Sequence, residues 1–267
     1  MIRDLTFRKK SFGKLAEDYQ KYRKPYNPKI YKKFFSLIKK SDKGIRILDI
    51  GCGTGKSTEP LITEAPSKLR KSLKVIGCDH DPLMLRYARA GADKNGLPIE
   101  YVSGKAEKLP FKSGQFDAVI AGTAFHWFAN KKAFLEIKRV LKPGGFFLAF
   151  WKGPTKINTK GKWVGREVYD KYKCTSVIKL WRNIDRTKKL FQSGGFKRFK
   201  SFNVFETQKD SVNDLIGAHR SNSKYAVLSP RNRKGFIKEM TIAYKKALGK
   251  KKYFVSKRES TACYAFK

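Results

Sequence analysis

Short apolar runs, each bounded by turn residues, recur along the first 151 residues of the chain. They predict buried strands at residues 45–50, 74–79, 99–102, 116–121 and 145–151. Between these runs, apolar positions recur at helical spacing instead. Because strands and helices alternate, the pattern predicts a parallel sheet that helices cover on both faces.

Several helix boundaries are also visible in the pattern. Asp81 and Pro82 predict a helix start with Asp81 as the N-cap, and the motif LKPGG at 141–145 predicts a helix stop. A further amphipathic helix is predicted over residues 28–40. The apolar positions expected on these helices are Leu83, Leu85, Tyr87 and Ala88; Phe134, Leu135, Ile137, Val140 and Leu141; and Ile30, Phe34, Leu37 and Ile38.

After the fifth strand the alternation loosens, because polar and aromatic residues mix from 154 to 200. Further elements are then predicted: a strand at 199–206, helices at 211–219 and 231–248, and a last strand at 259–266. The chain shows no internal repeat, low-complexity tract or proline-rich linker. We therefore expect one domain over residues 1–267.

The composition fits a folded, enzyme-sized body, since 40% of the 267 residues are hydrophobic. The longest apolar run, Phe146–Trp151, is too short to span a membrane, and the N-terminal residues MIRDLTFRKK lack the apolar stretch of a secretory signal. We expect a cytoplasmic protein without a membrane partner. The four cysteines form no CxxC pair, which fits a reducing compartment, and no metal site is predicted.

The formal net charge of +39 would attract RNA, DNA or an anionic surface. However, the surplus is mostly lysine and is scattered along the chain in short groups. A nucleic-acid surface concentrates its charge, uses arginine forks and interleaves exposed aromatic residues. Dispersed lysine on solvated faces is therefore the favoured interpretation, and a nucleic-acid partner is possible but not favoured.

A glycine turn, ILDIGCGTG at 47–55, follows the first predicted strand. Such a turn lets the backbone approach a ligand at a helix N-terminus. The spacing of Gly51, Gly53 and Gly55 is G-x-G-x-G, and Lys56 stands where a dinucleotide motif needs its third glycine. A phosphate loop is also absent, because Ile50 occupies the position of its first glycine. Diphosphate binding is disfavoured.

Together with the acid of VIGCD (75–79) and the segments GKAEKLPF (104–111), FDAVIAGTAFHWF (116–128) and FLEIKRVLKPGG (134–145), this turn resembles the class I S-adenosylmethionine-dependent methyltransferases. The resemblance covers residues 12–151. Within this class, the chain is similar to the trans-aconitate methyltransferase-like, type 11 domain family. It implies an α/β, doubly wound Rossmann-like sheet of seven mostly parallel strands in the order 3-2-1-4-5-7-6. It also implies capping helices in 1–44, a cofactor-binding core in 45–153, and an acceptor pocket with the last two strands in 154–267.

The resemblance implies S-adenosyl-L-methionine as cofactor. Asp79 stands where the family's carboxylate takes both ribose hydroxyls, and Asp49 holds either the cofactor's amino group or the turn itself. His80 either stacks on the adenine or faces solvent, and Lys105 departs from the usual acidic or small residue of the adenine loop. The expected cofactor-binding residues are Tyr19, Arg23, Asp49, Gly51, Cys52, Gly53, Thr54, Gly55, Asp79, His80, Ala106, Glu107 and Thr123.

His126 follows the fourth predicted strand and is the candidate catalytic residue. Three roles stay open for it: general base on a hydroxyl or amine, wall of the site, or structural residue. A carboxylate acceptor needs no base. The acceptor pocket is expected in residues 154–190, with Trp163, Tyr169, Tyr172 and Trp181, and in 218–225, where His219, Arg220, Ser221 and Tyr225 either grip an anionic acceptor or belong to the core.

These observations predict a methyltransferase that acts on a small-molecule carboxylate or hydroxyl by in-line displacement. An RNA methyltransferase is one alternative, which the charge motivates. A cofactor-binding subunit without catalytic activity is the other. The sequence leaves the acceptor, the methylated atom and the oligomeric state open.

Overall fold

The computed structural model describes residues 15–39, 44–153, 157–159, 162–173 and 183–267. The chain divides into two compact units. The helical unit comprises Met1–Lys24, Gly153–Val177 and Phe205–Glu259, and the sheet unit comprises Pro25–Lys152, Ile178–Val204 and Ser260–Lys267. Each unit contains parts of more than one of the three predicted segments, 1–44, 45–153 and 154–267. The division of a single domain into these three segments stays a prediction.

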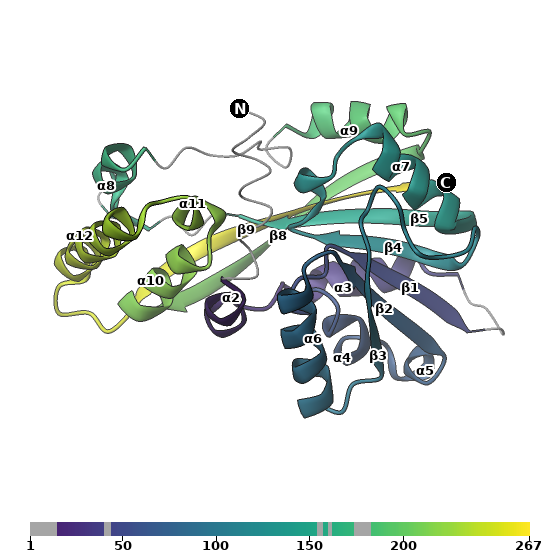
Figure 1. Cartoon of the computed structure of the whole chain (residues 1–267), viewed down its shortest axis with the longest axis horizontal. Coiled ribbons are helices and arrows are strands. Elements are labelled where there is room, and N and C mark those ends of the chain that lie inside the picture. Colours follow the sequence, from purple (N-terminus) through teal and green to yellow (C-terminus); the bar gives the residue numbers. More distant parts are fainter. Residues whose placement is uncertain (1–14, 40–43, 154–156, 160–161, 174–182) are drawn as a thin grey trace. The chain divides into compact units, whose positions relative to one another are not determined.

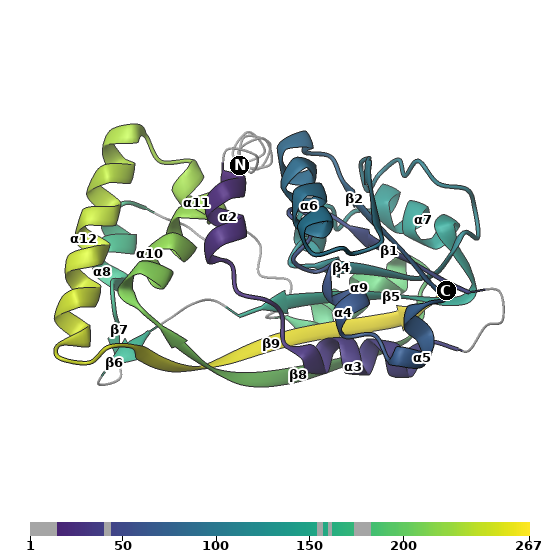
Figure 2. The ribbon, with the colours of Figure 1, turned by 90° about the horizontal axis from the view of Figure 1, so that it is seen from below.

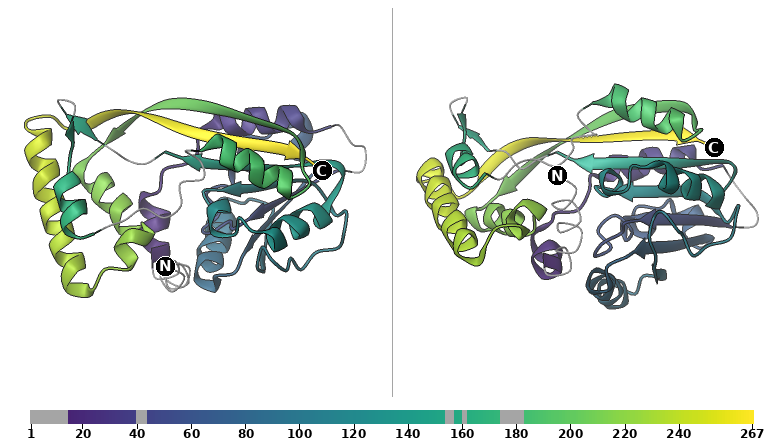
Figure 3. Two further views of the ribbon diagram at one scale, coloured as in Figure 1. Left: turned by 90° about the horizontal axis from the view of Figure 1, so that it is seen from above. Right: turned by 45° about the horizontal axis from the view of Figure 1, so that its top comes forward.

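Seven strands form one sheet in the order β3-β2-β1-β4-β5-β9-β8, which confirms the predicted 3-2-1-4-5-7-6 topology. Strands β1 to β5 pair in parallel, and β9 pairs antiparallel with β5. The long strands β8 and β9 run side by side, in green and yellow, in both views of Figure 3. The strands are β1 Ile45–Ile50, β2 Leu73–Asp79, β3 Ile99–Ser103, β4 Phe116–Gly122, β5 Leu141–Lys152, β8 Lys197–Asp210 and β9 Phe254–Phe266.

Helices of the sheet unit cover both faces of its strands, as the alternating pattern predicts (Figure 1). On one face α3 and α4 contribute Ile30, Phe34 and Leu61 to a core with β1, β4 and β5. On the other face α7 and α9 contribute Phe134 and Phe191 to a second core. The helices are α3 Pro28–Leu37, α4 Pro60–Thr63, α5 Ser67–Arg70, α6 Pro82–Lys94, α7 Lys131–Val140 and α9 Ile184–Ser193.

The predicted start of α6 is confirmed, because the Asp81 carboxylate accepts the N–H groups of Leu83 and Met84. Two of the apolar positions expected on these helices are not buried: Leu83 is 43% exposed and Leu135 is 56% exposed. Leu83 is two residues before buried Leu85, and residues two apart do not share a helix face.

The predicted helix stop at LKPGG also differs in detail, since β5 already begins at Leu141. Leu141 pairs with Phe116 of β4, and a register shift follows before Phe146 pairs with Ala118. The proline and two glycines therefore lie in an irregular start of a strand. A register irregularity at the start of a strand tolerates the missing N–H of proline.

The helical unit contains α2 Ala16–Tyr22, α8 Arg166–Lys171, α10 Val212–Arg220, α11 Ser223–Ala226 and α12 Pro230–Leu248, with a hairpin of β6 Asn158–Thr159 and β7 Lys162–Trp163. Figure 2 shows α10 beside α2 and α12. Gly217 permits the contact with α2, because a Cβ at this position would overlap the Tyr22 ring. Among the described helices, none combines the length and apolarity needed to cross a membrane.

A buried histidine links three elements of the helical unit. His219 Nδ1 lies 2.7 Å from the Tyr169 hydroxyl, and Nε2 lies 2.7 Å from the Tyr244 hydroxyl. Burial, with a smaller contribution from the nearby Arg23 and Lys224 cations, lowers the pKa of His219 to about 3. His219 is therefore neutral in the folded chain, with one ring nitrogen donating and the other accepting.

This burial predicts a pH dependence of stability. The pKa of His219 is about 3 when folded and about 6.5 when unfolded, so the unfolded chain binds the extra proton as pH falls through this window. The stability advantage of wild type over His219→Gln should shrink by about 2 kcal/mol from about pH 7 to about pH 5. Urea unfolding of both proteins at the two pH values measures it. An advantage that stays constant with pH would contradict a neutral, buried His219.

Candidate functional site

The glycine turn after β1 is attached to the next strand by its backbone. The N–H groups of Gly51 and Cys52 both donate to the Cys78 carbonyl, at 2.7 and 3.2 Å. Gly51 has φ +68°, and a Cβ there would lie 2.7 Å from the Ala124 Cβ. Glycine at 51 thus lets the loop after β4 pack on the turn. Cys52 is buried, which raises the pKa of its thiol and leaves it a small packing residue.

Asp79, at the end of β2, joins the turn to the start of α6. Its Oδ2 accepts the Gly53 N–H at 2.8 Å, and its Oδ1 accepts the Asp81 N–H at 3.0 Å. The half-exposed His80 places Nδ1 3.4 Å from the same Oδ1. Each carboxylate oxygen has two acceptor positions, so Asp79 retains capacity for further donors.

Asp49 lies fully buried one residue before the end of β1. Its Oδ2 accepts both the Ser57 and Thr58 hydroxyls, at 2.6 and 2.8 Å. Burial raises the pKa of Asp49 to about 7, against the two hydroxyl hydrogen bonds that lower it, and the negative charge of Asp79 raises it further. Its other oxygen, Oδ1, has no hydrogen-bond partner among the described residues.

Two more polar atoms around this turn resemble Asp49 Oδ1. Thr54 Oγ1 and Glu59 Oε1 are buried and, within the described part of the chain, have no hydrogen-bond partner. Buried polar groups are rarely left unpaired, so three such atoms around one turn need an explanation, such as a ligand that supplies donors. A Cβ on Gly53 would meet nothing within 4 Å, so there is open space beside this backbone.

The loop after β4 begins with a strained residue. Thr123 has φ +53°, which is uncommon for a residue with a branched Cβ. Its hydroxyl oxygen accepts the Tyr26 hydroxyl at 2.9 Å and the Lys152 N–H at 3.4 Å. These contacts hold the loop between β5 and the segment before α3, beside the glycine turn.

His126 lies in the short 3₁₀ helix η2, Phe125–Trp127, of this loop. The Trp151 indole N–H donates to His126 Nδ1 at 3.2 Å, and the Trp127 ring lies 5.0 Å away, centroid to centroid. Burial lowers the pKa of His126 to about 4. The ring is therefore neutral at physiological pH, with Nδ1 as an acceptor.

The predicted adenine-side residues lie in the same unit. Ala106 is buried, and the half-buried Glu107 accepts the Asn130 side-chain N–H at 3.0 Å. Lys105, which departs from the family pattern, is exposed and forms an isolated β-bridge with Lys108. Nine of the thirteen expected cofactor residues lie at the carboxyl ends of β1, β2 and β4 or in the loops that follow them, and these ends share one sheet edge.

Tyr19 and Arg23 lie in the helical unit, and their placement in the cofactor site stays a prediction. The Arg23 guanidinium lies 5.2 Å from the Tyr19 ring centroid. Arg23 also donates to the Ser221 hydroxyl at 2.9 Å and to its carbonyl at 3.3 Å.

The residues expected to grip an anionic acceptor are engaged within the helical unit. Both His219 nitrogens face tyrosine hydroxyls, and Arg220 forms an ion pair with Asp18 at 2.7 Å. Ser221 accepts from Arg23. The core interpretation of this segment is therefore favoured over the acceptor interpretation. Trp181, expected in the same pocket, lies outside the described residues.

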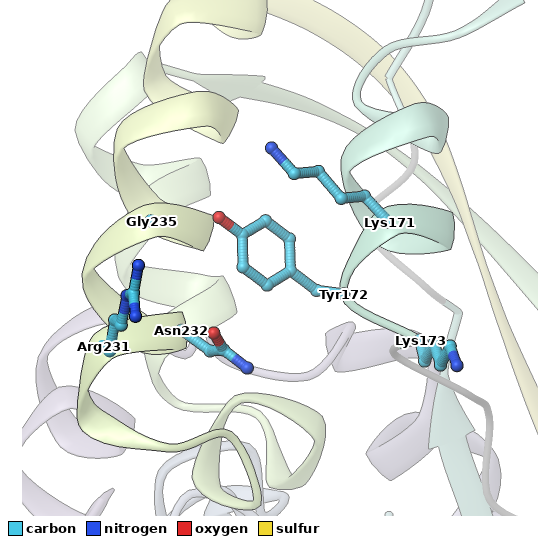
Figure 4. A pocket seen from close by; sticks show the side chains of 6 residues that line it. All are labelled: Lys171, Tyr172, Lys173, Arg231, Asn232 and Gly235. Atoms are coloured by element: carbon cyan, nitrogen blue, oxygen red, sulfur yellow. The ribbon is translucent and has the colours of Figure 1, made fainter.

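A basic pocket of about 540 Å³ also lies in the helical unit (Figure 4). Tyr172 occupies its middle, and Tyr172 and Lys171 both donate to Glu239, at 2.9 and 2.7 Å. Its lining residues are Lys171, Tyr172, Lys173, Arg231, Asn232 and Gly235. Arg231 and Lys173 lie on opposite sides of the tyrosine, so their charges do not converge on one point.

Sequence reasoning missed four residues of the site. Ser57 and Thr58 hold Asp49, Tyr26 holds Thr123, and Trp151 holds His126. A hydroxyl pair following the glycine turn was a usable signal for the first two. Within the described residues, no group of three histidine, cysteine or acidic side chains is arranged to hold a metal ion.

The strand order β3-β2-β1-β4-β5-β9-β8, with β9 antiparallel to β5, is that of the Rossmann-like methyltransferase fold. Residues 48–149 match the family described as "Methyltransferase domain". The matched segment contains every expected cofactor residue except Tyr19 and Arg23.

Curated relatives and solved structures agree with this class. A demethylmenaquinone methyltransferase of Thermus thermophilus is 42% identical over 101 residues, which are 38% of this chain and 44% of that protein. An uncharacterized methyltransferase of Schizosaccharomyces pombe is 28% identical over 79% of this chain and 77% of its own. Phosphoethanolamine N-methyltransferase 2 of Haemonchus contortus superposes with TM-score 0.53 at 18% identity, over 94% of this chain and 56% of that one.

Two glycine substitutions test whether a ligand passes over the turn. Gly53 (φ +55°) and Gly96 (φ +59°) share a left-handed backbone and open space where a Cβ would stand. Each change to alanine should therefore cost about 1 to 2 kcal/mol of stability. Only Gly53→Ala should also weaken binding of S-adenosylhomocysteine, by roughly tenfold or more, about 1.4 kcal/mol. Calorimetry on both variants checks this, and equal affinities would place the ligand elsewhere.

Proposed function

We propose that the protein is an S-adenosylmethionine-dependent methyltransferase that methylates an oxygen of a small molecule by in-line displacement. The observation that carries the proposal is the set of buried, unpartnered acceptor atoms at the glycine turn: Asp49 Oδ1, Thr54 Oγ1 and Glu59 Oε1. The cofactor carries an ammonium group and hydroxyl donors, which are the chemical complement of such atoms.

The residues of the turn fit this cofactor. Asp79 would accept the ribose hydroxyls while still holding the Gly53 N–H, because its two oxygens offer four acceptor positions. Gly53 would let the ligand approach the backbone, since no side chain fills that space. Asp49 would stabilise positive charge nearby, and a cation there would favour its ionised form. When bound, the cofactor supplies a methyl group activated by a sulfonium.

The chain's own contribution to the rate is orientation. Holding the acceptor oxygen in line with the methyl carbon converts an encounter into an intramolecular step, which supplies much of the acceleration. Ala124 packs on Gly51, and Tyr26 donates a hydrogen bond to the Thr123 hydroxyl, so the loop after β4 would form a wall beside the turn. Such a wall would position the acceptor for methyl transfer.

The relatives support a small-molecule acceptor. One is a demethylmenaquinone methyltransferase, and another, 40% identical over 40% of this chain, is a ubiquinone biosynthesis O-methyltransferase. The Haemonchus structure holds S-adenosylhomocysteine together with phosphomonomethylethanolamine. An RNA acceptor is the second candidate, and the net charge of +39 is the observation that favours it.

The ribose assignment is tested at Asp79. Asp79→Ala should weaken binding of S-adenosylhomocysteine by at least tenfold, about 1.4 kcal/mol, because charge-assisted hydrogen bonds to the ligand and the bond to Gly53 are both lost. Asp81→Ala is the matched control, since it removes the neighbouring acid and the α6 cap without touching the turn. Unchanged affinity in Asp79→Ala, or an equal loss in both variants, would remove the assignment.

The acceptor class is tested with a labelled methyl donor. Total RNA and a small-molecule extract are incubated separately with the protein at about 150 mM salt, where nonspecific attraction to RNA is weakened. We expect label in the small-molecule extract and none at a discrete RNA position. Label in one RNA nucleotide alone would replace the small-molecule proposal by the RNA one, and label in neither would favour the non-catalytic subunit.

A further inference from the structure

We infer that Trp151 is a positioning residue that holds His126 in the tautomer that donates a hydrogen bond through Nε2. Because His126 then cannot remove a proton, the molecule that accepts the methyl group presents an oxygen that is already ionised, a carboxylate. This inference rests on the proposed methyl transfer. It decides among the three roles that the sequence leaves open for His126, and it assigns Trp151 a part that sequence reasoning did not find.

The geometry begins with the position of the pair. His126 follows Ala124 by two residues, and Ala124 packs on the glycine turn at Gly51. Trp151 follows Phe150, which pairs with Gly122, the last residue of β4. Both side chains therefore lie at the carboxyl edge of the sheet unit, where open parallel sheets bind their ligands.

Trp151 is a firm support for the ring. Its side chain is 1% exposed, and its indole lies 6.2 Å from the Phe125 ring within the aromatic core. Packing on this scale leaves the indole few alternative rotamers. The N–H direction is consequently set by the core and not by the histidine.

An indole nitrogen only donates, so His126 Nδ1 must present its lone pair to Trp151. The single proton of the neutral ring then sits on Nε2. A proton on Nδ1 would oppose the indole N–H and leave that buried donor without an acceptor. Burial acts in the same direction, since it lowers the pKa of His126 to about 4, and among the described residues no charged group contributes to the shift.

In this arrangement His126 cannot act as a general base. To accept a proton from a substrate, Nε2 would need a lone pair, which requires that its proton move to Nδ1 with loss of the Trp151 bond. A hydroxyl or amine acceptor has a proton to lose, whereas a carboxylate at neutral pH has none. The carboxylate oxygen attacks the methyl carbon, the new O–C bond forms, the S–C bond breaks, and the electron pair goes to sulfur. No proton moves, and the product is a methyl ester.

The donor state can be read directly, independently of activity. The chain has three histidines, so a spectrum of protein carrying ¹⁵N-labelled histidine is simple, and His126→Gln assigns the signal. We expect Nε2 to carry the proton, Nδ1 to show the shift of an acceptor, and neither to change from about pH 7.5 to about pH 5. A proton on Nδ1, or a titration near the usual histidine pKa, would overturn the inference.

Two tryptophan variants separate the hydrogen bond from the surrounding aromatic packing. Trp151→Phe removes the donor to Nδ1 and should move the Nδ1 signal away from its acceptor shift and raise the pKa of His126. Trp127→Phe removes an indole that also lies against the ring but does not donate to Nδ1, and it should leave both quantities unchanged. Equal effects of the two variants would reduce Trp151 to a packing residue.

The role in turnover is tested with side chains that donate without acting as bases. The probe is a total small-molecule extract with labelled methyl donor, read as labelled methanol released from methyl esters by alkali. The His126→Gln variant keeps an N–H near the Nε2 position and should retain activity within about tenfold, whereas His126→Leu should lose roughly a hundredfold. Equal losses of activity in the two variants would indicate that His126 acts as a general base, and would overturn the inference.

Failure of the inference and failure of the proposed function are distinguishable. Affinity for S-adenosylhomocysteine should be the same in wild type, His126→Gln and Trp151→Phe, because none of these changes touches the turn. Label that resists alkali would show methylation of another atom and overturn the carboxylate assignment while leaving the methyltransferase intact. No binding of S-adenosylhomocysteine by the wild type would instead remove the proposed function.

Discussion

The hydrogen bond from the Gly53 N–H to Asp79 Oδ2 joins the two strand ends on which the site depends. It fixes the glycine turn against β2, while the Gly51 and Cys52 N–H groups fix the same turn through the Cys78 carbonyl. The turn can take this course only because Gly51 and Gly53 adopt positive φ angles. The loop after β4 then packs on Gly51, so that three loops from separate strands meet at one edge.

Electrostatics explains how this edge can favour a cationic ligand in a chain of such high positive charge. The lysines lie mostly on solvated surfaces, where their fields are screened, whereas Asp49 is buried and its pKa is raised to about 7. A local acid pair within a basic chain favours a cationic, hydroxyl-bearing ligand over a diphosphate. The nearby His126 adds no charge, because burial lowers its pKa to about 4 and leaves the ring neutral.

The helical unit uses its polar residues internally. His219 bridges Tyr169 and Tyr244, Arg220 pairs with Asp18, and the buried ion pair of Arg258 and Asp210 joins β9 to β8. Each pairing compensates a group that would otherwise be buried at a cost. Residues that look like an anion-binding set in the sequence are therefore satisfied by one another.

The sequence by itself determined the parallel strands and the glycine turn, whereas the strand order 3-2-1-4-5-7-6 came from the resemblance to a known family. Apolar runs of strand length, the Asp81 cap and the three glycines are local signals, and local periodicity and backbone freedom are written in adjacent residues. It did not determine which side of α6 would face inward, and Leu83, one of the expected apolar positions, is exposed. Only tertiary structure decided that Trp151 donates to His126, that Tyr26 holds Thr123, and that His219 is enclosed by two tyrosines. These contacts join residues 25 to 97 positions apart, and their distances and directions depend on how whole strands and helices pack, which no local pattern specifies.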